Sequence, residues 1–225
     1  MRDDWRIFSR LSNAALAWYN PCMLFDGLVK LYVAHAGADF SYDPARLSHA
    51  RREKIARIRS SHAQKLSAAA EVALDCALRE NIPGYAPPPA LFYAPDGRPC
   101  VPGAHISLSH AGEIAVCAVA RAPVGVDVER ADRDLSRLRE KIIAPMDDPN
   151  RSLIDLWVAK EAYLKLTGEG LSGGMRNYAI DGETVRDARG AVRAHIQRPQ
   201  LPGYHIAVCQ GAPFACALIA VPADL

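Results

Sequence analysis

The 225-residue sequence has no uninterrupted apolar run of about 18 residues, the length that a membrane-spanning helix requires. It also has little net charge, because 27 basic residues are balanced by 25 acidic ones, while half of the residues are apolar. Disordered chains combine low hydrophobicity with high net charge. The composition therefore favours a soluble globular protein, and the bulk charge gives no reason to expect nucleic acid or a membrane as a partner.

The six cysteines include no C-x-x-C pair, and most of them lie in apolar runs. Thiols in such runs behave as small buried hydrophobic groups, so we interpret the cysteines as reduced core residues. The chain begins Met1-Arg2-Asp3-Asp4-Trp5 and lacks the basic segment and apolar stretch of a signal peptide. We therefore expect a cytoplasmic location.

The hydrophobic pattern predicts an α+β protein with two similar lobes. The tetrapeptide Ile-Ala-Val-Cys occurs at 114–117 and again at 206–209, each time in a late strand of its half. Both halves have the order strand, helix, strands, which predicts a pseudo-twofold pair of lobes at 28–124 and 125–225, preceded by an N-terminal extension at 1–27. Ligands usually bind in the cleft between such lobes.

Apolar periodicity, proline and glycine positions and capping residues predict the individual elements. We expect a strand at 28–34, one or two helices within 46–81, a proline-rich loop at 83–103, a three-strand meander at 105–109, 114–120 and 124–129, a helix at 152–167 and a second sheet that includes 204–209 and 214–221. The connection at 130–150 is charged and only weakly helical.

Two carboxylates stand out in the segment Gly125-Val126-Asp127-Val128-Glu129. Side chains alternate along a strand, so Asp127 and Glu129 project from one face while Val126 and Val128 project from the other. The motif alone also fits an edge strand with a solvated acidic face.

The helix at 152–167 carries a second set of charged residues. Helical spacing places Trp157, Glu161 and Lys165 on one stripe. The opposite stripe is apolar and can pack on a core; it consists of Leu156, Ala159, Tyr163 and Leu166. Glu161 and Lys165 by themselves could form an ordinary surface ion pair. Together with Asp127 and Glu129, however, Glu161 makes an all-oxygen set that suits Mg²⁺ and a pyrophosphate ligand.

Other polar residues could bind phosphate. Ser109 and His110 follow a strand and can both donate hydrogen bonds, although a Ser-His pair beside a turn is often only local capping. The segment 46–65 contains seven basic residues and one acidic residue, Glu53, which fits either a solvated face or a polyanion site. Arg98 adds a cation on the proline-rich loop.

The sequence resembles the surfactin-type 4'-phosphopantetheinyl transferases over residues 28–221. These enzymes carry a G-[IV]-D-[IV]-E strand followed by a W-x-x-K-E-[AS]-x-x-K-x-x-G-x-G helix, and the chain has both in that order, at 125–129 and 157–170. The Ser109-His110 element and the Gly97-Arg98-Pro99 loop before them agree with the family pattern.

The resemblance implies a reaction in which a serine of an apo acyl or peptidyl carrier protein receives the phosphopantetheine arm of coenzyme A. It also implies that coenzyme A and Mg²⁺ bind between the lobes. By this match Asp127, Glu129 and Glu161 are the metal ligands, and Lys165 lies beside the scissile pyrophosphate. The remaining contacts to coenzyme A are then Ser109, His110 and Arg98, together with the basic residues Arg51 and Lys54. Glu161 is our candidate base for the serine proton.

One departure from the family pattern concerns the carrier protein. Only 27 residues separate Glu129 from Trp157, and the aromatic-rich acidic helix of many relatives is replaced there by the segment 138–149. Two alternatives stay open at this stage: a non-catalytic relative that binds coenzyme A or a carrier, and a Mg²⁺-dependent phosphohydrolase. Two lobes in one chain favour a monomer.

Overall fold

The computed structural model describes residues 26–170 and 174–222, so nearly all of the expected N-terminal extension lies outside the described residues. The described part is a mixed α+β structure, as predicted. Its helices are α2 (His49–Ala56), α3 (Ser61–Asn81), α4 (Arg139–Ile142) and α5 (Leu153–Thr167), with 3₁₀ turns at Pro44–Arg46, Ser136–Leu138 and Met175–Asn177. No helix in this part of the chain is long and apolar enough to cross a membrane.

The strands form two larger sheets and one short pair. They are β1 (Leu28–His35), β2 (Phe92–Tyr93), β3 (Pro99–Cys100), β4 (His105–Ala111), β5 (Ile114–Ala120), β6 (Gly125–Arg130), β7 (Tyr178–Asp181), β8 (Thr184–Asp187), β9 (Val192–Gln197), β10 (Tyr204–Gln210) and β11 (Ala215–Ala220). The first sheet has the order β11-β1-β5-β4 and the second has the order β6-β10-β9-β8-β7, while β2 pairs with β3.

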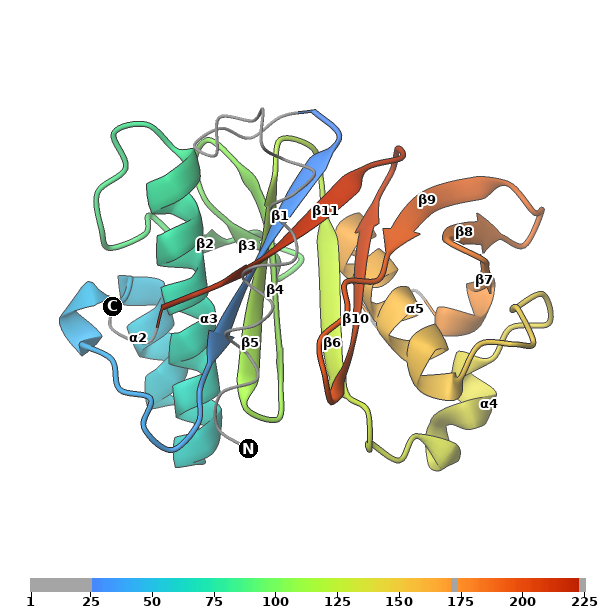
Figure 1. Cartoon of the computed structure of the whole chain (residues 1–225), viewed down its shortest axis with the longest axis horizontal. Coiled ribbons are helices and arrows are strands. Elements are labelled where there is room, and N and C mark those ends of the chain that lie inside the picture. Colours follow the sequence, from blue (N-terminus) through green and yellow to red (C-terminus); the bar gives the residue numbers. More distant parts are fainter. Residues whose placement is uncertain (1–25, 171–173, 223–225) are drawn as a thin grey trace.

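The two sheets pack face to face between two long helices, which gives four layers (Figure 1). Alternation along the strands produces this arrangement, because each strand sends one side chain inward and the next outward. On β5, Val116 and Ala118 join the cluster between the sheets, whereas Cys117 and Val119 face α3. Helix α5 covers the outer face of the second sheet in the same way.

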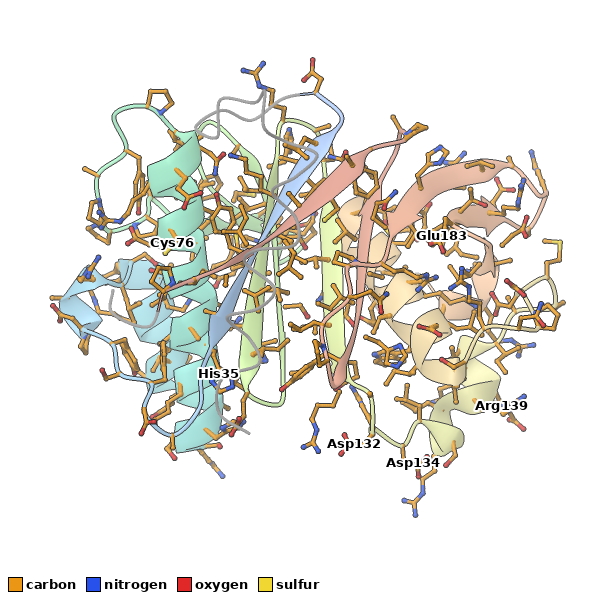
Figure 2. All side chains as sticks on the ribbon, in the orientation of Figure 1. His35, Cys76, Asp132, Asp134, Arg139 and Glu183 are labelled. Carbon is orange, nitrogen blue, oxygen red and sulfur yellow. The ribbon has the colours of Figure 1, made fainter. Side chains whose placement is uncertain are left out.

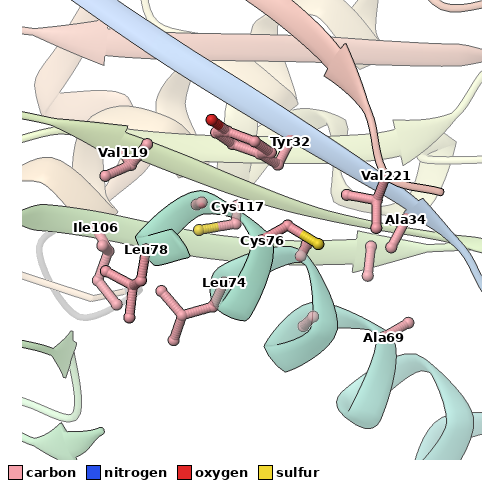
Figure 3. Close-up of a cluster of buried hydrophobic side chains, with 14 of the residues drawn as sticks. Tyr32, Ala34, Ala69, Leu74, Cys76, Leu78, Ile106, Cys117, Val119 and Val221 are labelled. Atoms are coloured by element: carbon pink, nitrogen blue, oxygen red, sulfur yellow. The ribbon is translucent and has the colours of Figure 1, made fainter. Parts of the chain in front are cut away.

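The cluster under α3 explains the alanine-rich sequence of that helix (Figure 3). Small side chains such as Ala69, Ala73 and Ala77 let the helix lie close to the sheet, and Leu74 and Tyr32 fill the remaining space. Cys76, Cys117 and Cys209 are buried and free, as predicted, whereas Cys100 and Cys216 are free but only partly buried, so the prediction of a core position is wrong for these two. Cys22 lies outside the described residues.

Two predicted strand placements are wrong. The third strand of the expected meander, β6, does not pair with β5 but forms the edge of the second sheet, antiparallel to β10. The expected ladder between the described strands β5 and β6 is absent, and at that edge the Ser107 hydroxyl of β4 accepts a hydrogen bond from the Val126 amide of β6 at 3.0 Å. The last strand, β11, was expected in the second sheet but crosses to the first, where it pairs in parallel with β1.

The helix predictions are confirmed. The segment 46–81 holds two helices, α2 and α3. Helix α5 begins after Ser152, whose hydroxyl accepts from the Asp155 amide, and it ends at Gly168, which has φ +79°. The boundary predicted between the lobes at 124/125 stays a prediction. Strand β11 follows that boundary in the sequence but belongs to the first sheet.

Candidate functional site

The site begins at an unusually close contact between β6 and α5. A Cβ atom on Gly125 would lie 1.9 Å from the Ala162 carbonyl oxygen and 2.6 Å from the Leu166 amide nitrogen. Only glycine fits there. Gly125 lies on the same face of β6 as Asp127 and Glu129, so the two carboxylates face the helix that carries Glu161 and Lys165. The steric need for this glycine was not foreseen from the sequence.

Three predicted site residues contact one another directly. Lys165 Nζ donates to Asp127 Oδ1 at 2.7 Å and to Ser109 Oγ at 2.9 Å, and Ser109 Oγ donates to the same Asp127 oxygen at 2.7 Å. The Asp127 side chain is 9% exposed and the Lys165 side chain 31% exposed. The contact thus joins β4 of the first sheet to β6 and α5 of the second, and the lysine ammonium stays reachable from solvent.

Glu161 lies beside this group with an unsatisfied oxygen. Its Oε1 atom is buried and has no hydrogen-bond partner among the described residues. Burial raises the pKa of Glu161, and the negative charge of Asp127 raises it further, against the opposing charges of Lys165 and Arg133. A buried, unpartnered carboxylate oxygen with a second carboxylate nearby is suited to a divalent cation, because the cation would compensate both charges.

Glu129 points toward a different partner. Its Oε2 atom contacts the guanidinium of Arg133, and its Oε1 atom accepts from the Arg130 amide at 2.9 Å. Within the described ranges, no group of three or more His, Cys, Asp or Glu side chains has an arrangement that would hold a metal ion. The donor chemistry of Asp127 and Glu161 fits such an ion, whereas the convergence of all three carboxylates on it stays a prediction.

Two of the predicted basic residues, Arg51 and Lys54, lie on α2. The Arg51 side chain is buried, donates to Glu71 Oε2 at 3.0 Å and to Ser67 Oγ at 3.2 Å, and keeps a buried Nη2 atom without a partner in the described structure. Lys54 Nζ lies 5.6 Å from the centre of the Tyr93 ring. Burial lowers the pKa of Lys54, and Arg51 lowers it further.

His110 lies among these cations. Desolvation lowers the pKa of His110, and the charges of Lys165, Lys54 and Arg51 lower it further, in that order. Charged side chains from α2 and α5 therefore both act on His110 of β4. Ser67, Glu71 and Tyr93, which surround the basic residues, were not singled out from the sequence, because serine, glutamate and tyrosine carry no local signal there.

Arg98 packs on the end of α5. It donates to the Leu166 carbonyl oxygen at 3.3 Å and forms an ion pair with Asp96 at 2.7 Å. A Cβ atom on Gly168 would lie 2.7 Å from Arg98 Nε and from Asp96 Oδ2. The proline-rich loop thus places Arg98 against Leu166, the residue that follows Lys165 in α5. Its predicted contact with coenzyme A phosphate stays a prediction.

A cavity of about 590 Å³ lies elsewhere, between the end of α5 and the turn that joins β10 to β11. Its lining includes Tyr163, Arg193 and Gln210, and none of the predicted site residues is among the described residues that line it.

The fold and the site together define a class: a two-sheet α+β protein with carboxylates and cations gathered between a strand and a helix. Residues 123–218 match the model of the 4'-phosphopantetheinyl transferase superfamily. This range includes β6, α5 and β10, and with them Asp127, Glu161 and Lys165.

Curated relatives agree with the family match. The chain is 34% identical over 139 residues to 4'-phosphopantetheinyl transferase psf-1 of Bacillus pumilus, which covers 53% of this chain and 60% of the relative. It is 28% identical over 136 residues to 4'-phosphopantetheinyl transferase Sfp of Bacillus subtilis (strain 168), which covers 52% and 61%. The chain spans about three fifths of the length of these relatives. The resemblance to the surfactin-type 4'-phosphopantetheinyl transferases is confirmed.

Proposed function

We propose that this protein transfers the 4'-phosphopantetheine arm of coenzyme A to a serine of an apo acyl or peptidyl carrier protein and releases 3',5'-ADP. The observation that carries the proposal is the meeting of Lys165, Asp127 and Ser109 beside the unpartnered oxygen of Glu161. Asp127, Glu161 and Lys165 belong to the segment 123–218 that matches the family, and Ser109 lies before it.

We assign Asp127, Glu129 and Glu161 as ligands of a Mg²⁺ ion that coenzyme A would share. When bound there, the ion would neutralise negative charge on the pyrophosphate oxygens. The support is the all-carboxylate donor set and the unsatisfied Glu161 oxygen. In this proposal Asp127 has two tasks, since the same carboxylate also fixes the Lys165 ammonium by a 2.7 Å hydrogen bond.

The cations then bind the phosphates of coenzyme A. Lys165 and Ser109 would contact the pyrophosphate beside Asp127, and Arg98 would add a contact from the end of α5. Arg51 and Lys54, which lie on α2, would hold a second phosphate. The unpartnered Arg51 Nη2 atom and the desolvated Lys54 ammonium support this assignment, because buried donors without acceptors are costly unless a ligand satisfies them.

The transfer step exchanges one phosphorus–oxygen bond for another. The carrier serine oxygen attacks the β-phosphorus of coenzyme A and forms a new phosphorus–oxygen bond. The bond from this phosphorus to the bridging pyrophosphate oxygen breaks, and that oxygen leaves as part of 3',5'-ADP. Glu161 would accept the serine proton, directly or through a water molecule. Lys165 would stabilise charge on the phosphoryl and leaving oxygens.

Further parts of the proposal concern the whole enzyme. We propose two lobes related by a pseudo-twofold axis, which is supported by one long helix on the outer face of each sheet (Figure 1). A monomer, a cytoplasmic location and the absence of nucleic acid and membrane partners stay predictions from the sequence. So does the effect of the short segment 130–156 on carrier docking.

One incubation tests the reaction. The protein is mixed with Mg²⁺ and coenzyme A, with and without a panel of apo carrier proteins, and the intact mass of each carrier is measured. A mass gain equal to the phosphopantetheine arm supports the proposed transfer. Coenzyme A binding without turnover would instead indicate a non-catalytic relative, and carrier-independent release of 3',5'-ADP would indicate a phosphohydrolase.

A further inference from the structure

Arg133 lies beside the candidate metal site without belonging to any predicted set. It follows the end of β6 and is flanked by Asp132 and Asp134, which lie at the edge of the molecule (Figure 2). Its guanidinium contacts Glu129 Oε2, and its Cζ atom lies 5.1 Å from the centre of the Trp157 ring. Two contacts therefore hold one arginine between β6 and α5.

The stacking on Trp157 gives Arg133 a fixed position. Trp157 precedes Glu161 by one turn on the same stripe of α5, so the guanidinium that contacts Glu129 also packs on the helical neighbour of Glu161. Its positive charge acts on Glu161 as well as on Glu129. The Arg133 side chain is 41% exposed and the Glu129 side chain only 12% exposed, so the arginine covers a carboxylate that is otherwise mostly buried.

A divalent ion and this arginine need the same oxygen. Glu129 Oε2 cannot bind Arg133 and a metal ion at once without weakening both contacts, because the two cations repel each other at close range. The pyrophosphate of coenzyme A changes this balance, since it supplies further oxygen ligands for the ion and a negative charge that the released guanidinium can face.

We propose that Arg133 is a positioning residue that competes with the divalent ion for Glu129. The ion then binds weakly by itself and tightly only together with coenzyme A. This inference rests on the proposed function and concerns the same site. It makes the binding of the ion and of coenzyme A mutually dependent, and by thermodynamic linkage each must strengthen the other by the same factor.

The test measures Mn²⁺ as a stand-in for Mg²⁺, with free Mn²⁺ followed by its electron paramagnetic resonance signal. The wild-type protein, Arg133→Gln and Arg130→Gln are titrated with and without coenzyme A. Arg130 is a matched control, because it lies in the same turn but its side chain pairs with the exposed Asp132. We expect Arg133→Gln to bind Mn²⁺ about three- to tenfold more tightly without coenzyme A, and Arg130→Gln to bind it as the wild type does.

The competition also predicts a coupling. The factor by which coenzyme A tightens Mn²⁺ binding should be smaller in Arg133→Gln than in the wild type. In a Glu129→Gln background the Arg133 substitution should lose its effect on Mn²⁺ affinity. Arg133→Lys, which keeps the charge but not the flat guanidinium, should fall between wild type and Arg133→Gln.

Equal or weaker Mn²⁺ binding by Arg133→Gln would overturn the inference, and so would a full effect that persists in the Glu129→Gln background. The outcome is separable from that of the proposed function. Normal carrier modification, with no effect of Arg133→Gln on Mn²⁺ affinity, would contradict only the role of Arg133. If Arg133→Gln raises the Mn²⁺ affinity but the protein neither binds coenzyme A nor modifies carriers, the transferase proposal is wrong and the competition for Glu129 is supported.

Discussion

Lys160 and Lys165 lie on the same helix, α5, but one stabilises the fold and the other belongs to the candidate site. Lys160 is 1% exposed and donates to the Ile142 carbonyl oxygen and to Asp147 Oδ2, each at 2.6 Å. Lys165 is partly exposed and turned toward Asp127 and Ser109. Five residues apart on a helix, the two lysines leave it in different directions. The first ties α5 to the segment after α4, and only the second is available to a ligand.

The buried pair predicts a large stability effect for Lys160→Met. Removing the ammonium leaves Asp147 buried with its charge uncompensated, although two backbone amides still donate to it. We expect a loss of about 3 kcal/mol in the free energy of unfolding, measured by urea denaturation. Lys165→Met is the matched control, and it should cost clearly less because its ion pair is more exposed. Similar losses for both variants would contradict the structural role of Lys160.

Glu161 gives the sharpest catalytic prediction. Glu161→Gln keeps the size of the side chain but cannot accept the serine proton at neutral pH. We expect coenzyme A binding, measured by calorimetry without a divalent ion, to be largely kept, while transfer to the carrier, measured by intact mass with Mg²⁺, falls about 100-fold or more. Unchanged turnover would remove Glu161 from the mechanism.

At the scale of elements, the contact between β6 and α5 depends on a missing side chain. A Cβ atom on Gly125 would collide with two backbone atoms of α5, which cannot move without shifting the helix. We expect Gly125→Ala to lower the free energy of unfolding by about 1–3 kcal/mol and to lower transfer as well. Gly211→Ala is the control, since a Cβ atom at that position would meet no other atom within 4 Å. Wild-type stability in Gly125→Ala would contradict the close approach.

The start of α5 predicts a pH dependence. Burial alone would raise the pKa of Asp155, but hydrogen bonds from Ser152 and His205 outweigh it and hold the pKa below its ordinary value. A carboxyl with a lowered pKa in the folded state stabilises the protein above its unfolded pKa of about 4, and this stabilisation is lost as the pH falls through the folded value.

The stability difference between wild type and Asp155→Asn should therefore shrink as the pH is lowered from about 6 to about 3. Urea denaturation at several pH values measures it, and Asp39→Asn, at an exposed position, is the control. A difference that grows toward acid pH would contradict the assignment of Asp155.

Local signals predicted the elements better than their partners. The capping serine and terminal glycine predicted α5, alternation predicted β4, and an unbroken apolar run predicted β5. Alternation in β6 predicted that Asp127 and Glu129 share a face. The same pattern fits an edge strand in either sheet, so it could not tell that β6 pairs with β10 and not with β5. The parallel pairing of β11 with β1 joins residues nearly 190 positions apart, and nothing local encodes it.

At the scale of the molecule, the two sheets share one core. Val29 and Leu31 of β1 lie in the same cluster as Val126 of β6 and Val208 of β10. Strand β11 adds a covalent link, because the chain leaves the second sheet at β10 and finishes in the first. The two halves should therefore unfold together.

Leu31→Ala tests this cooperativity. Leu31 is fully buried between the sheets, and its truncation should cost about 2–5 kcal/mol. Hydrogen exchange should then accelerate in β10 of the second sheet as well as in β5 of the first. Val192→Ala, at an exposed position, should change neither. Faster exchange confined to the first sheet would show that the halves unfold separately.

The site, too, was predictable only in part. Motifs indicated Asp127, Glu161, Ser109 and Lys165; in the structure Asp127, Ser109 and Lys165 contact one another, and the charge of Asp127 acts on Glu161. Tyr93 and Arg133 were not predicted, because their importance comes from neighbours on other elements: Lys54 above the tyrosine ring, and Glu129 and Trp157 around the arginine.

The central claim is that carboxylates from β6 and α5 hold one divalent ion for coenzyme A. A crystal structure with Mn²⁺ and coenzyme A, with the ion located by its anomalous scattering, tests it most directly. We predict a single peak bridging Asp127, Glu161 and the pyrophosphate, with Glu129 released from Arg133 to reach it. A peak at another place, or an Asp127–Glu161 pair with no ion between its oxygens and the pyrophosphate, would contradict the account.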